Sequence, residues 1–281
     1  GFTLAESAQF VVLFDDELAL KLGANILGAA NEVYIAADGH KKSITGPGLG
    51  NYLSMAKAVA ATKNVIGKKA LKNRTFVQAH GTGTPQNRTT ESHILSQIAG
   101  IFGIENWPIA AVKSYLGHSI ASSAGDQLAA TLGSFAHGIL PGILTIDEIA
   151  EDVTQENLDF LLAHRELPLN SIDATIINSK GFGGNNASAS ILAPHIVEKM
   201  LEKRHGANAL KDYKKRNEQV VDKMAAYDQA MIEGRNNTIY KFDHNVLDNE
   251  SLEMNESKIS INEIEPPISL EFESSYADMC E

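Results

Sequence analysis

Short apolar runs alternate with helix-like segments through residues 1 to about 193, and this alternation limits the chain to few folds. Runs rich in apolar and β-branched residues predict strands at 10–14, 33–37, 109–112, 174–177 and 187–192. Small and apolar residues at helical spacing predict helices at 52–61 and 119–137. Strands and helices that alternate in this way are typical of an α/β fold, in which helices cover a mainly parallel sheet.

The pattern changes after Pro194. Apolar side chains then recur three, four or seven residues apart, at Leu210, Tyr213, Val220, Met224, Tyr227 and Met231. This spacing predicts one face of a long helix, within a helical extension at 194–242. The helix either packs on the body of the fold or offers a separate surface to a partner.

Residues 243–281 form an acidic tail. They carry eleven acidic side chains and one basic side chain, a net charge of −10 out of −11 for the whole chain. The tail has little periodicity and contains Pro266-Pro267, so we expect a flexible or loosely docked segment. The nearly neutral remainder lacks the basic surface that nucleic acid requires, and we expect no nucleic-acid partner.

Apolar runs and cysteine content indicate where the chain works. No apolar run approaches the roughly 20 residues that a membrane span needs, so we expect no membrane association. The single cysteine, Cys280, cannot form an internal disulfide, which fits a reducing cytoplasmic setting. The chain begins at Gly1, inside a strand-like stretch and without Met, and this start predicts a fragment.

A histidine motif follows the strand-like run at 75–79. It reads His80-Gly81-Thr82-Gly83-Thr84-Pro85. The glycines let the backbone pass close to a ligand, and the hydroxyls of Thr82 and Thr84 are able to hydrogen-bond an amide-bearing chain. A structural loop between strand and helix is the alternative for His80.

A second histidine, His118, stands between Gly117 and a helix-like run of small residues. The partial positive charge at a helix N-terminus disfavours the imidazolium, so His118 is expected to be neutral. A neutral ring is able to donate an N–H to a developing oxyanion. An ordinary helix cap with tight packing explains the same residues equally well.

Two charged residues and one glycine-rich element complete the candidate site. Lys113 and Glu91 are predicted to pair if they are buried, because an unpaired buried ammonium is costly; the alternative is two solvated surface residues. Around Phe182, the glycines of 181–184 allow backbone N–H groups to face a substrate while Phe182 shields it from water. A tight turn is the alternative.

Together these elements resemble the beta-ketoacyl-acyl-carrier-protein synthase family of the thiolase superfamily. The resemblance rests on the His80–Pro85 motif with Glu91, on Lys113 with Gly117-His118, and on Asn178-Ser179 with 181–184. It covers residues 1–193, which look like the later part of the synthase domain. It implies a layered α/β/α/β/α thiolase-like fold, incomplete because its N-terminal part is missing, and a homodimer.

The resemblance also implies an activity, a decarboxylating Claisen condensation in fatty acid or polyketide synthesis. An acyl group from acyl-CoA or acyl carrier protein is loaded onto a Cys, malonyl on acyl carrier protein loses carbon dioxide, and the carbanion attacks the acyl-enzyme. His80 and His118 would stabilise the enolate, and Lys113 paired with Glu91 would support them. Phe182 would gate the acyl channel and offer a backbone N–H, while Thr82 and Thr84 would hold the phosphopantetheine arm. No tightly bound cofactor and no metal are expected.

The chain departs from the family pattern at three places. Lys180 stands where the family often has Phe, and Asn185 where it often has Thr, which puts chain-length preference in doubt. The family's active Cys lies upstream of the Gly1 strand, so we expect this polypeptide alone to form no acyl-enzyme.

Four alternatives stay open from the sequence. They are a polyketide synthase ketosynthase, a non-catalytic synthase-like subunit, a decarboxylase with Gln or Ser in place of the missing Cys, and a thiolase. A thiolase would need a second catalytic Cys late in the domain, and residues 1–279 contain none. A non-catalytic subunit has little need to keep His80, His118 and Lys113 together.

Overall fold

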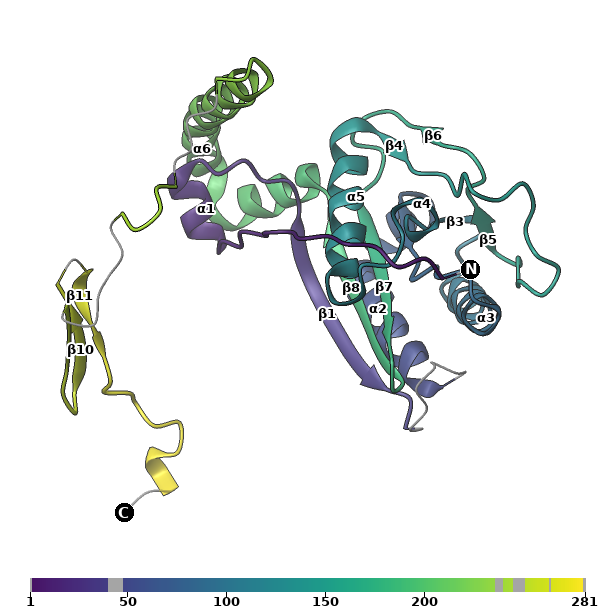
Figure 1. The fold of residues 1–281 in the computed structure, drawn as a ribbon, viewed down its shortest axis with the longest axis horizontal. Helices are drawn as coiled ribbons and strands as arrows, with labels where there is room; N and C mark the ends of the chain where they lie inside the picture. Colours follow the sequence, from purple (N-terminus) through teal and green to yellow (C-terminus); the bar gives the residue numbers. More distant parts are fainter. Residues whose placement is uncertain (1, 40–47, 236–239, 245–250, 263, 280–281) are drawn as a thin grey trace. The chain divides into compact units, whose positions relative to one another are not determined.

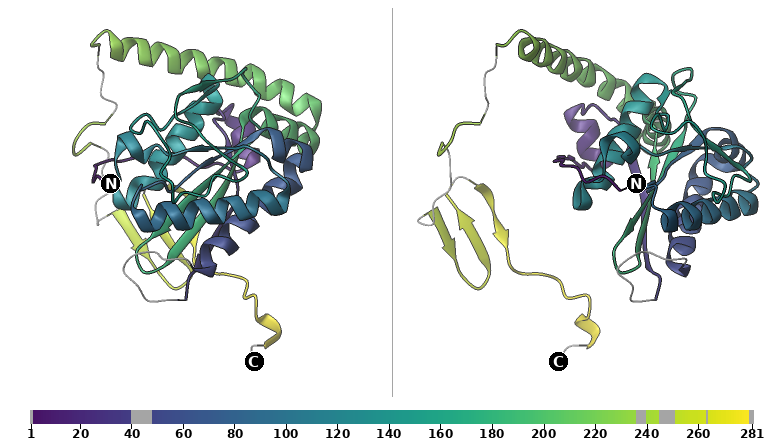
Figure 2. Two further views of the ribbon diagram at one scale, coloured as in Figure 1. Left: turned by 90° about the vertical axis from the view of Figure 1, so that its right-hand side faces the viewer. Right: turned by 45° about the vertical axis from the view of Figure 1, so that its right-hand side comes forward.

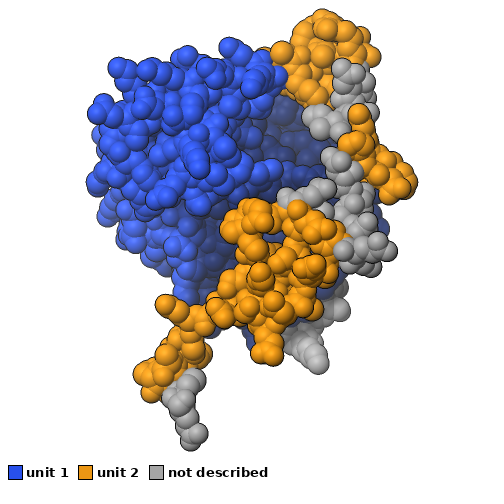
Figure 3. All heavy atoms as spheres, turned by 90° about the vertical axis from the view of Figure 1, so that its left-hand side faces the viewer, with its two compact units in different colours: residues 1–224 blue, residues 225–281 orange. Residues whose placement is uncertain are grey.

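The computed structural model describes residues 2–39, 48–235, 240–244, 251–262 and 264–279. The chain divides into two compact units, residues 1–224 and 225–281, which are coloured separately in Figure 3. The first unit holds all the candidate site residues. The predicted division at 193 and 242 stays a prediction.

The first unit is built on a six-stranded mixed sheet (Figure 1). Its strands, in spatial order, are β1 (Ala29–Ala37), β8 (Asn185–Leu192), β7 (Ala174–Gly181), β2 (Thr75–Gln78), β3 (Trp107–Ala110) and β5 (Leu158–Phe160). The pairings β7–β2, β2–β3 and β3–β5 are parallel, whereas β1–β8 and β8–β7 are antiparallel. The α/β fold with this sheet at its centre is as expected, although only the part of the sheet from β7 to the edge strand β5 is parallel.

Helices cover both faces of this sheet (Figure 2). One face packs under α2 (Leu49–Asn73) and α3 (Pro85–Phe102), and the other under α5 (Ser123–His137). Neighbouring strand residues serve opposite faces, as strand geometry requires: Val77 packs with α2 and α3, and Phe76 packs with α5. The remaining short elements are α4 (Lys113–Leu116), η1 (Ile120–Ser122), β4 (Ile139–Leu140) and β6 (Arg165–Glu166).

The predicted long helix is present as α6 (Pro194–Ile232), with a break at Gly206, whose φ is 86°. After the break, α6 packs on α1 (Asp16–Leu22). The Tyr213 hydroxyl donates to the Ala24 carbonyl at 2.9 Å, and the Arg216 guanidinium donates twice to the Leu20 carbonyl, at 3.0 and 3.1 Å. Leu210 and Tyr213 are buried, but the later members of the predicted apolar face, Met224, Tyr227 and Met231, are 41–47% exposed.

The strand predicted at 10–14 is wrong. These residues are extended but belong to no strand, and Phe10 is 98% exposed. The apolar composition of a segment shows only that it favours a β-strand. The strand forms when a neighbouring strand supplies hydrogen-bond partners for its backbone. The described part of the chain supplies none to this segment.

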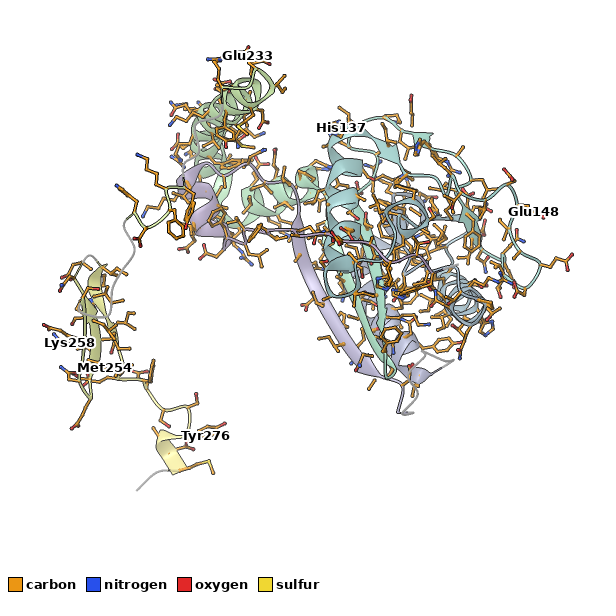
Figure 4. The ribbon with its side chains drawn as sticks, viewed as in Figure 1. His137, Glu148, Glu233, Met254, Lys258 and Tyr276 are labelled. Carbon is orange, nitrogen blue, oxygen red and sulfur yellow. The ribbon has the colours of Figure 1, made fainter. Side chains whose placement is uncertain are left out.

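The flexible or loosely docked tail expected at 243–281 stays a prediction, but the segment contains more regular structure than its sequence pattern indicated. The described residues include a three-stranded antiparallel sheet of β9 (Leu252–Met254), β10 (Lys258–Ile261) and β11 (Ile264–Ser269), followed by η3 (Ala277–Met279). Met254 and Lys258 are exposed on it (Figure 4). Pro266 and Pro267 lie in β11, an edge strand, where a missing N–H is tolerated. Cys280 lies outside the described residues.

The parallel part of the sheet positions the site residues. His80 comes two residues after β2, Lys113 comes shortly after β3, and Lys180 lies near the end of β7. Carboxyl ends of parallel strands meet at one edge of a sheet, where ligand sites of open α/β folds form.

Candidate active site

The two candidate histidines lie side by side. The ring centroids of His80 and His118 are 5.3 Å apart, and the rings meet edge to face at 81°. His80 is buried, whereas His118 is half-buried and also contacts the Phe2 ring at 5.0 Å. The predicted proximity of the two rings is therefore present in the fold.

Backbone hydrogen bonds fix which nitrogen of each ring carries the proton. The Lys180 N–H donates to His80 Nδ1 at 3.2 Å, and the Ile120 N–H donates to His118 Nδ1 at 3.0 Å. A backbone N–H only donates, so each Nδ1 must be an unprotonated acceptor. In a neutral imidazole the hydrogen is then on Nε2. Both rings are therefore Nε2–H donors.

Both rings are neutral at pH 7. Burial lowers the pKa of His80 to about 3; the charge of Glu91 opposes this, and Lys113, His118 and Lys180 add to it. Burial also lowers the pKa of His118, with Lys113 acting in the same direction and Asp126 opposing. The neutral state was expected from a helix N-terminus, but burial and the nearby cations are its causes here.

Glu91, on α3, is fully buried and holds the backbone of the first motif. Its carboxylate accepts four hydrogen bonds, from the N–H groups of His80 (2.7 Å) and Gly81 (2.9 Å) and from the side-chain amides of Asn178 (2.7 Å) and Asn87 (2.9 Å). Burial raises the pKa of this carboxyl, but the positive charge of Lys180 and the hydrogen bonds from Gly81 and Asn178 oppose burial, and the pKa lies below the usual range. Glu91 is ionised, and it fixes the position of the His80 backbone by accepting its N–H.

The predicted direct ion pair of Lys113 with Glu91 is wrong. No such contact is present between these two described residues; Lys113 Nζ donates to Gln127 Oε1 at 2.9 Å instead. The Glu91 oxygens are already taken by backbone and amide donors. Burial lowers the pKa of Lys113 to about 8, with the charges of Glu91 and Asp126 opposing, so the ammonium is mostly charged at pH 7.

Gln127, on α5, is a residue that the sequence did not single out. It is completely buried, and its side-chain amide donates to the carbonyls of Gln78 (2.9 Å), Ala79 (2.8 Å) and Asn178 (3.1 Å). It therefore ties the ends of β2 and β7 to Lys113. Its only sequence signal is a polar side chain on the buried face of an otherwise small and apolar helix.

The other predicted binding residues are placed as follows. Thr82 is buried, and its hydroxyl is 3.3 Å from that of Thr84. Phe182 is 66% exposed on the turn between β7 and β8, and its carbonyl accepts from Asn185 Nδ2 at 2.8 Å. Its predicted role in shielding a substrate from water stays a prediction, as does its role as a gate.

The N-terminal segment fixes the backbone of His118. The His118 N–H donates to the Thr3 carbonyl at 2.7 Å, and the Ala5 N–H donates to the His118 carbonyl at 3.1 Å. A Cβ on Gly117 would lie 2.8 Å from the Ala5 Cβ, and the φ of Gly117 is 77°. Only glycine combines this conformation with so close an approach.

The backbone of Ile120, whose N–H holds the His118 ring, is strained. Its φ is 59°, the left-handed region that β-branched residues rarely enter. The same residue supplies the N–H that caps His118 Nδ1. Strained backbone of this kind persists where the surroundings over-determine it, often at functional sites.

The part of the chain that the structure describes shows neither a metal-binding cluster nor a membrane-spanning helix. Within the described ranges, no three His, Cys, Asp or Glu side chains lie close enough to hold a metal ion. None of the described helices is both long and apolar enough to cross a membrane. Two N–H donors at one place suit negative charge on an oxygen atom.

Comparisons with known proteins identify the family. Residues 27–147 match the family described as "Beta-ketoacyl synthase, C-terminal domain". The chain is 48% identical over 280 residues to the beta-ketoacyl-[acyl-carrier-protein] synthase FabY of Pseudomonas aeruginosa, covering 99% of this chain and 44% of that protein. It is 27% identical over 188 residues to 3-oxoacyl-[acyl-carrier-protein] synthase 2 of Synechocystis, covering 67% of this chain and 43% of that protein.

Structural comparison agrees. The crystal structure of the ketosynthase FabY from P. aeruginosa matches with a TM-score of 0.92 and 47% identity, over 100% of this chain and 44% of that one. The chain thus spans less than half the length of these relatives. With its ordered motifs and thiolase-like α/β fold, the chain belongs to the beta-ketoacyl synthase family of the thiolase superfamily and carries the later part of the synthase domain.

Proposed function

We propose that this chain supplies the histidine pair of a beta-ketoacyl-acyl-carrier-protein synthase in fatty acid synthesis. One observation carries the proposal: His80 and His118 meet at 5.3 Å, both neutral, with each Nδ1 capped by a backbone N–H. Each Nε2–H is then left to donate. The substrate class follows from the family and from FabY, whose name specifies an acyl-carrier-protein substrate.

The reaction places negative charge where these donors act. The bond between the malonyl carboxylate and its α-carbon breaks, carbon dioxide leaves, and the electron pair moves into an enolate on the thioester oxygen. The enolate carbon then attacks an acyl thioester, a new carbon–carbon bond forms and the thiolate leaves. Neutral N–H donors stabilise the enolate oxygen without surrendering a proton to it. Two imidazolium rings would instead risk protonating the carbanion.

Other residues have supporting roles in this proposal. Lys113 adds positive charge and, through Gln127, is fixed to the strand ends that carry His80. Thr82 and Thr84 hold the phosphopantetheine arm of the carrier protein, and Phe182 gates the acyl channel and offers its backbone N–H to the acyl oxygen. The partners are acyl carrier protein and an acyl-CoA or acyl-ACP primer, in a cytoplasmic homodimer.

The nucleophilic thiol is proposed to come from residues that this sequence does not include. The only cysteine here is Cys280, in the acidic tail and outside the described residues. We call the polypeptide that joins this sequence to the cysteine-bearing part the complete synthase. The 10–14 segment, apolar and exposed, is suited to pair with that part.

The alternatives receive less support. Polyketide synthases match at 26–29% identity, against 48% for FabY. A non-catalytic subunit does not need two capped imidazoles, a buried lysine and a fully hydrogen-bonded Glu91. The helical extension and tail are proposed as additions shared with FabY, since FabY matches 99% of this chain and the Synechocystis relative only 67%.

An acylation assay tests the proposal. Incubated with a radiolabelled acyl thioester and malonyl-ACP, the complete synthase should form a covalent acyl-enzyme, release carbon dioxide and yield the 3-oxoacyl product. This chain alone should form no acyl-enzyme, and its variant Cys280→Ser should behave identically. Stable acylation of Cys280 with product formation by this chain alone would contradict the proposal, as would a complete synthase that releases no carbon dioxide.

A further inference from the structure

A completely buried amide contacts the Glu91 carboxylate. Asn178, on β7, is 0% exposed. Its Nδ2 donates to Glu91 Oε1 at 2.7 Å and to Asn51 Oδ1 at 3.3 Å, and its Oδ1 accepts from Asn51 Nδ2 at 2.7 Å. Both hydrogens of the Asn178 amide are therefore used inside the protein, and one of them is donated to Glu91.

The orientation of this amide is fixed by its neighbours. An ionised carboxylate only accepts hydrogen bonds, so the atom of Asn178 that faces Glu91 has to be the nitrogen. Asn51, in the first turn of α2, presents its own Nδ2 to the remaining oxygen and closes a reciprocal pair of amides. Asn51 is 1% exposed, and turning either amide over would leave buried donors and acceptors unpaired.

The two oxygens of Glu91 hold different parts of the first histidine motif. Oε1 accepts from the His80 N–H and from Asn178 Nδ2, both at 2.7 Å. Oε2 accepts from the Gly81 N–H and from Asn87 Nδ2, both at 2.9 Å. Asn178 is therefore the side chain that shares an oxygen of Glu91 with the His80 backbone.

The strand that carries Asn178 also holds the His80 ring. Lys180 lies two residues further along β7, and its backbone N–H donates to His80 Nδ1 at 3.2 Å. β7 therefore binds His80 twice, at the ring through the Lys180 N–H and at the backbone through Asn178 and Glu91. Together the two attachments determine where Nδ1 lies relative to the Lys180 N–H, and this bond is what keeps the ring hydrogen on Nε2.

We propose that Asn178 is a positioning residue: by donating to Glu91 it fixes the His80 backbone against β7, so that the Lys180 N–H meets Nδ1 and the ring hydrogen stays on Nε2. The catalytic meaning of this role rests on the proposed function, whereas the position of the ring hydrogen is measurable without catalysis. Without the Asn178 amide, Glu91 Oε1 loses its attachment to β7, and the ring is able to carry its hydrogen on either nitrogen.

The first measurement is long-range ¹H–¹⁵N NMR of the complete synthase, labelled at histidine. In the wild type, the hydrogen of His80 should be on Nε2 alone. Asn178→Ala should give a mixture of the two neutral forms, seen as a shift of the Nδ1 resonance toward that of a protonated nitrogen. Thr62→Val is the matched control, because it removes a buried hydrogen bond of 2.7 Å between α2 and Ser190 on β8. It should leave the His80 signals unchanged.

Asn178→Asp keeps the shape of the side chain and makes the bond to Glu91 depend on pH. Burial and the charge of Glu91, whose Oε1 lies 2.7 Å from this position, raise the pKa of the new carboxyl. The ammonium groups of Lys113 and Lys180 oppose this rise, but repulsion at hydrogen-bond distance is the largest of these influences. Below its pKa the new carboxyl donates an O–H to Glu91 in place of the amide. Above it, two carboxylates face each other and the donor is lost.

The second measurement is decarboxylation of malonyl-ACP by the same synthase as the pH is varied. Asn178→Ala should lower kcat by about 10²-fold, the usual effect of misplacing a catalytic group by about 1 Å, and should leave KM nearly unchanged. Asn178→Asp should approach the wild-type rate as the pH falls and the rate of the alanine variant as the pH rises. A purely structural role would cost stability and produce neither the separation of kcat from KM nor this pH dependence.

The outcomes separate this inference from the proposed function. If Asn178→Ala folds as the wild type does and its His80 hydrogen stays on Nε2 alone, Asn178 has no such role. An activity of Asn178→Asp, relative to the wild type, that does not change with pH would also overturn it, and this arm decides if the alanine variant does not fold. Failure of the proposed function would show instead as decarboxylation that does not depend on His80, with the NMR result for Asn178→Ala still as expected.

Discussion

Replacing Glu91 with alanine is expected to lower the free energy of unfolding by about 3–5 kcal/mol, the usual cost of removing one partner from a buried charged network. The variant leaves the N–H groups of His80 and Gly81 and the amides of Asn178 and Asn87 without their acceptor. It also removes the buried negative charge that favours the charged forms of Lys113 and Lys180. Urea denaturation followed by circular dichroism measures the change.

A matched control lies one turn earlier on the same helix. Arg88→Ala removes an exposed ion pair with Asp152, at 2.9 Å, and should cost less than about 1 kcal/mol. Glu91→Gln keeps the side-chain shape but points an NH₂ group at one of the backbone donors, so its loss should fall between the two. A change below about 1 kcal/mol for Glu91→Ala would contradict the network described here.

Removing either histidine from the complete synthase should slow decarboxylation of malonyl-ACP by about 10²–10³-fold, the usual effect of losing one oxyanion donor. His80→Ala and His118→Ala each remove one Nε2–H from the pair. Acylation of the enzyme's cysteine should change much less, because the acyl oxygen is proposed to be bound by backbone N–H groups instead. Carbon dioxide release and acyl-enzyme formation, measured separately, distinguish the two steps.

The control for this series is His93→Ala, since His93 is exposed on α3. It should decarboxylate at the wild-type rate. The double variant His80→Ala/His118→Ala should lose less than the product of the single effects if the rings act on one oxygen as a unit. Wild-type carbon dioxide release by either single variant would remove that histidine from the mechanism.

Much of the fold could be predicted from the sequence, because most segments that favour a strand or a helix also pack as one in the structure. The runs at 33–37 and 174–177 became strands, whereas the run at 109–112 overlaps β3 only at residues 109–110. The motif residues that follow β2, β3 and β7 lie at one edge of the sheet. Two segments differ from the expectation. The segment at 10–14 has strand composition but no strand beside it, and β11 carries two prolines that obscure its pattern. The local sequence shows which segments favour a strand. Whether such a segment pairs with another strand depends on residues that are distant in the sequence.

The residues of the candidate site could be predicted from the sequence more fully than the hydrogen bonds between them. The proximity of His80 and His118 was implied by the family resemblance, which assigns both rings to one enolate, and it is confirmed by the fold. The hydrogen-bond partner of Lys113 could not be predicted from the sequence, because it depends on how α5 packs against the sheet. This packing brings Gln127 to the ammonium. The burial of Lys180 was equally hidden, since its position alone shows neither Thr90 nor Glu91 nearby.

The proposed enolate stabilisation depends above all on which ring nitrogens of the two imidazoles carry a proton. Long-range ¹H–¹⁵N NMR of selectively labelled protein reports the protonation of each ring nitrogen directly. At pH 7, His80 and His118 should both be neutral, with the hydrogen on Nε2 and Nδ1 unprotonated, as the N–H groups of Lys180 and Ile120 require. A proton on Nδ1 of either ring, or an imidazolium at this pH, would contradict the account.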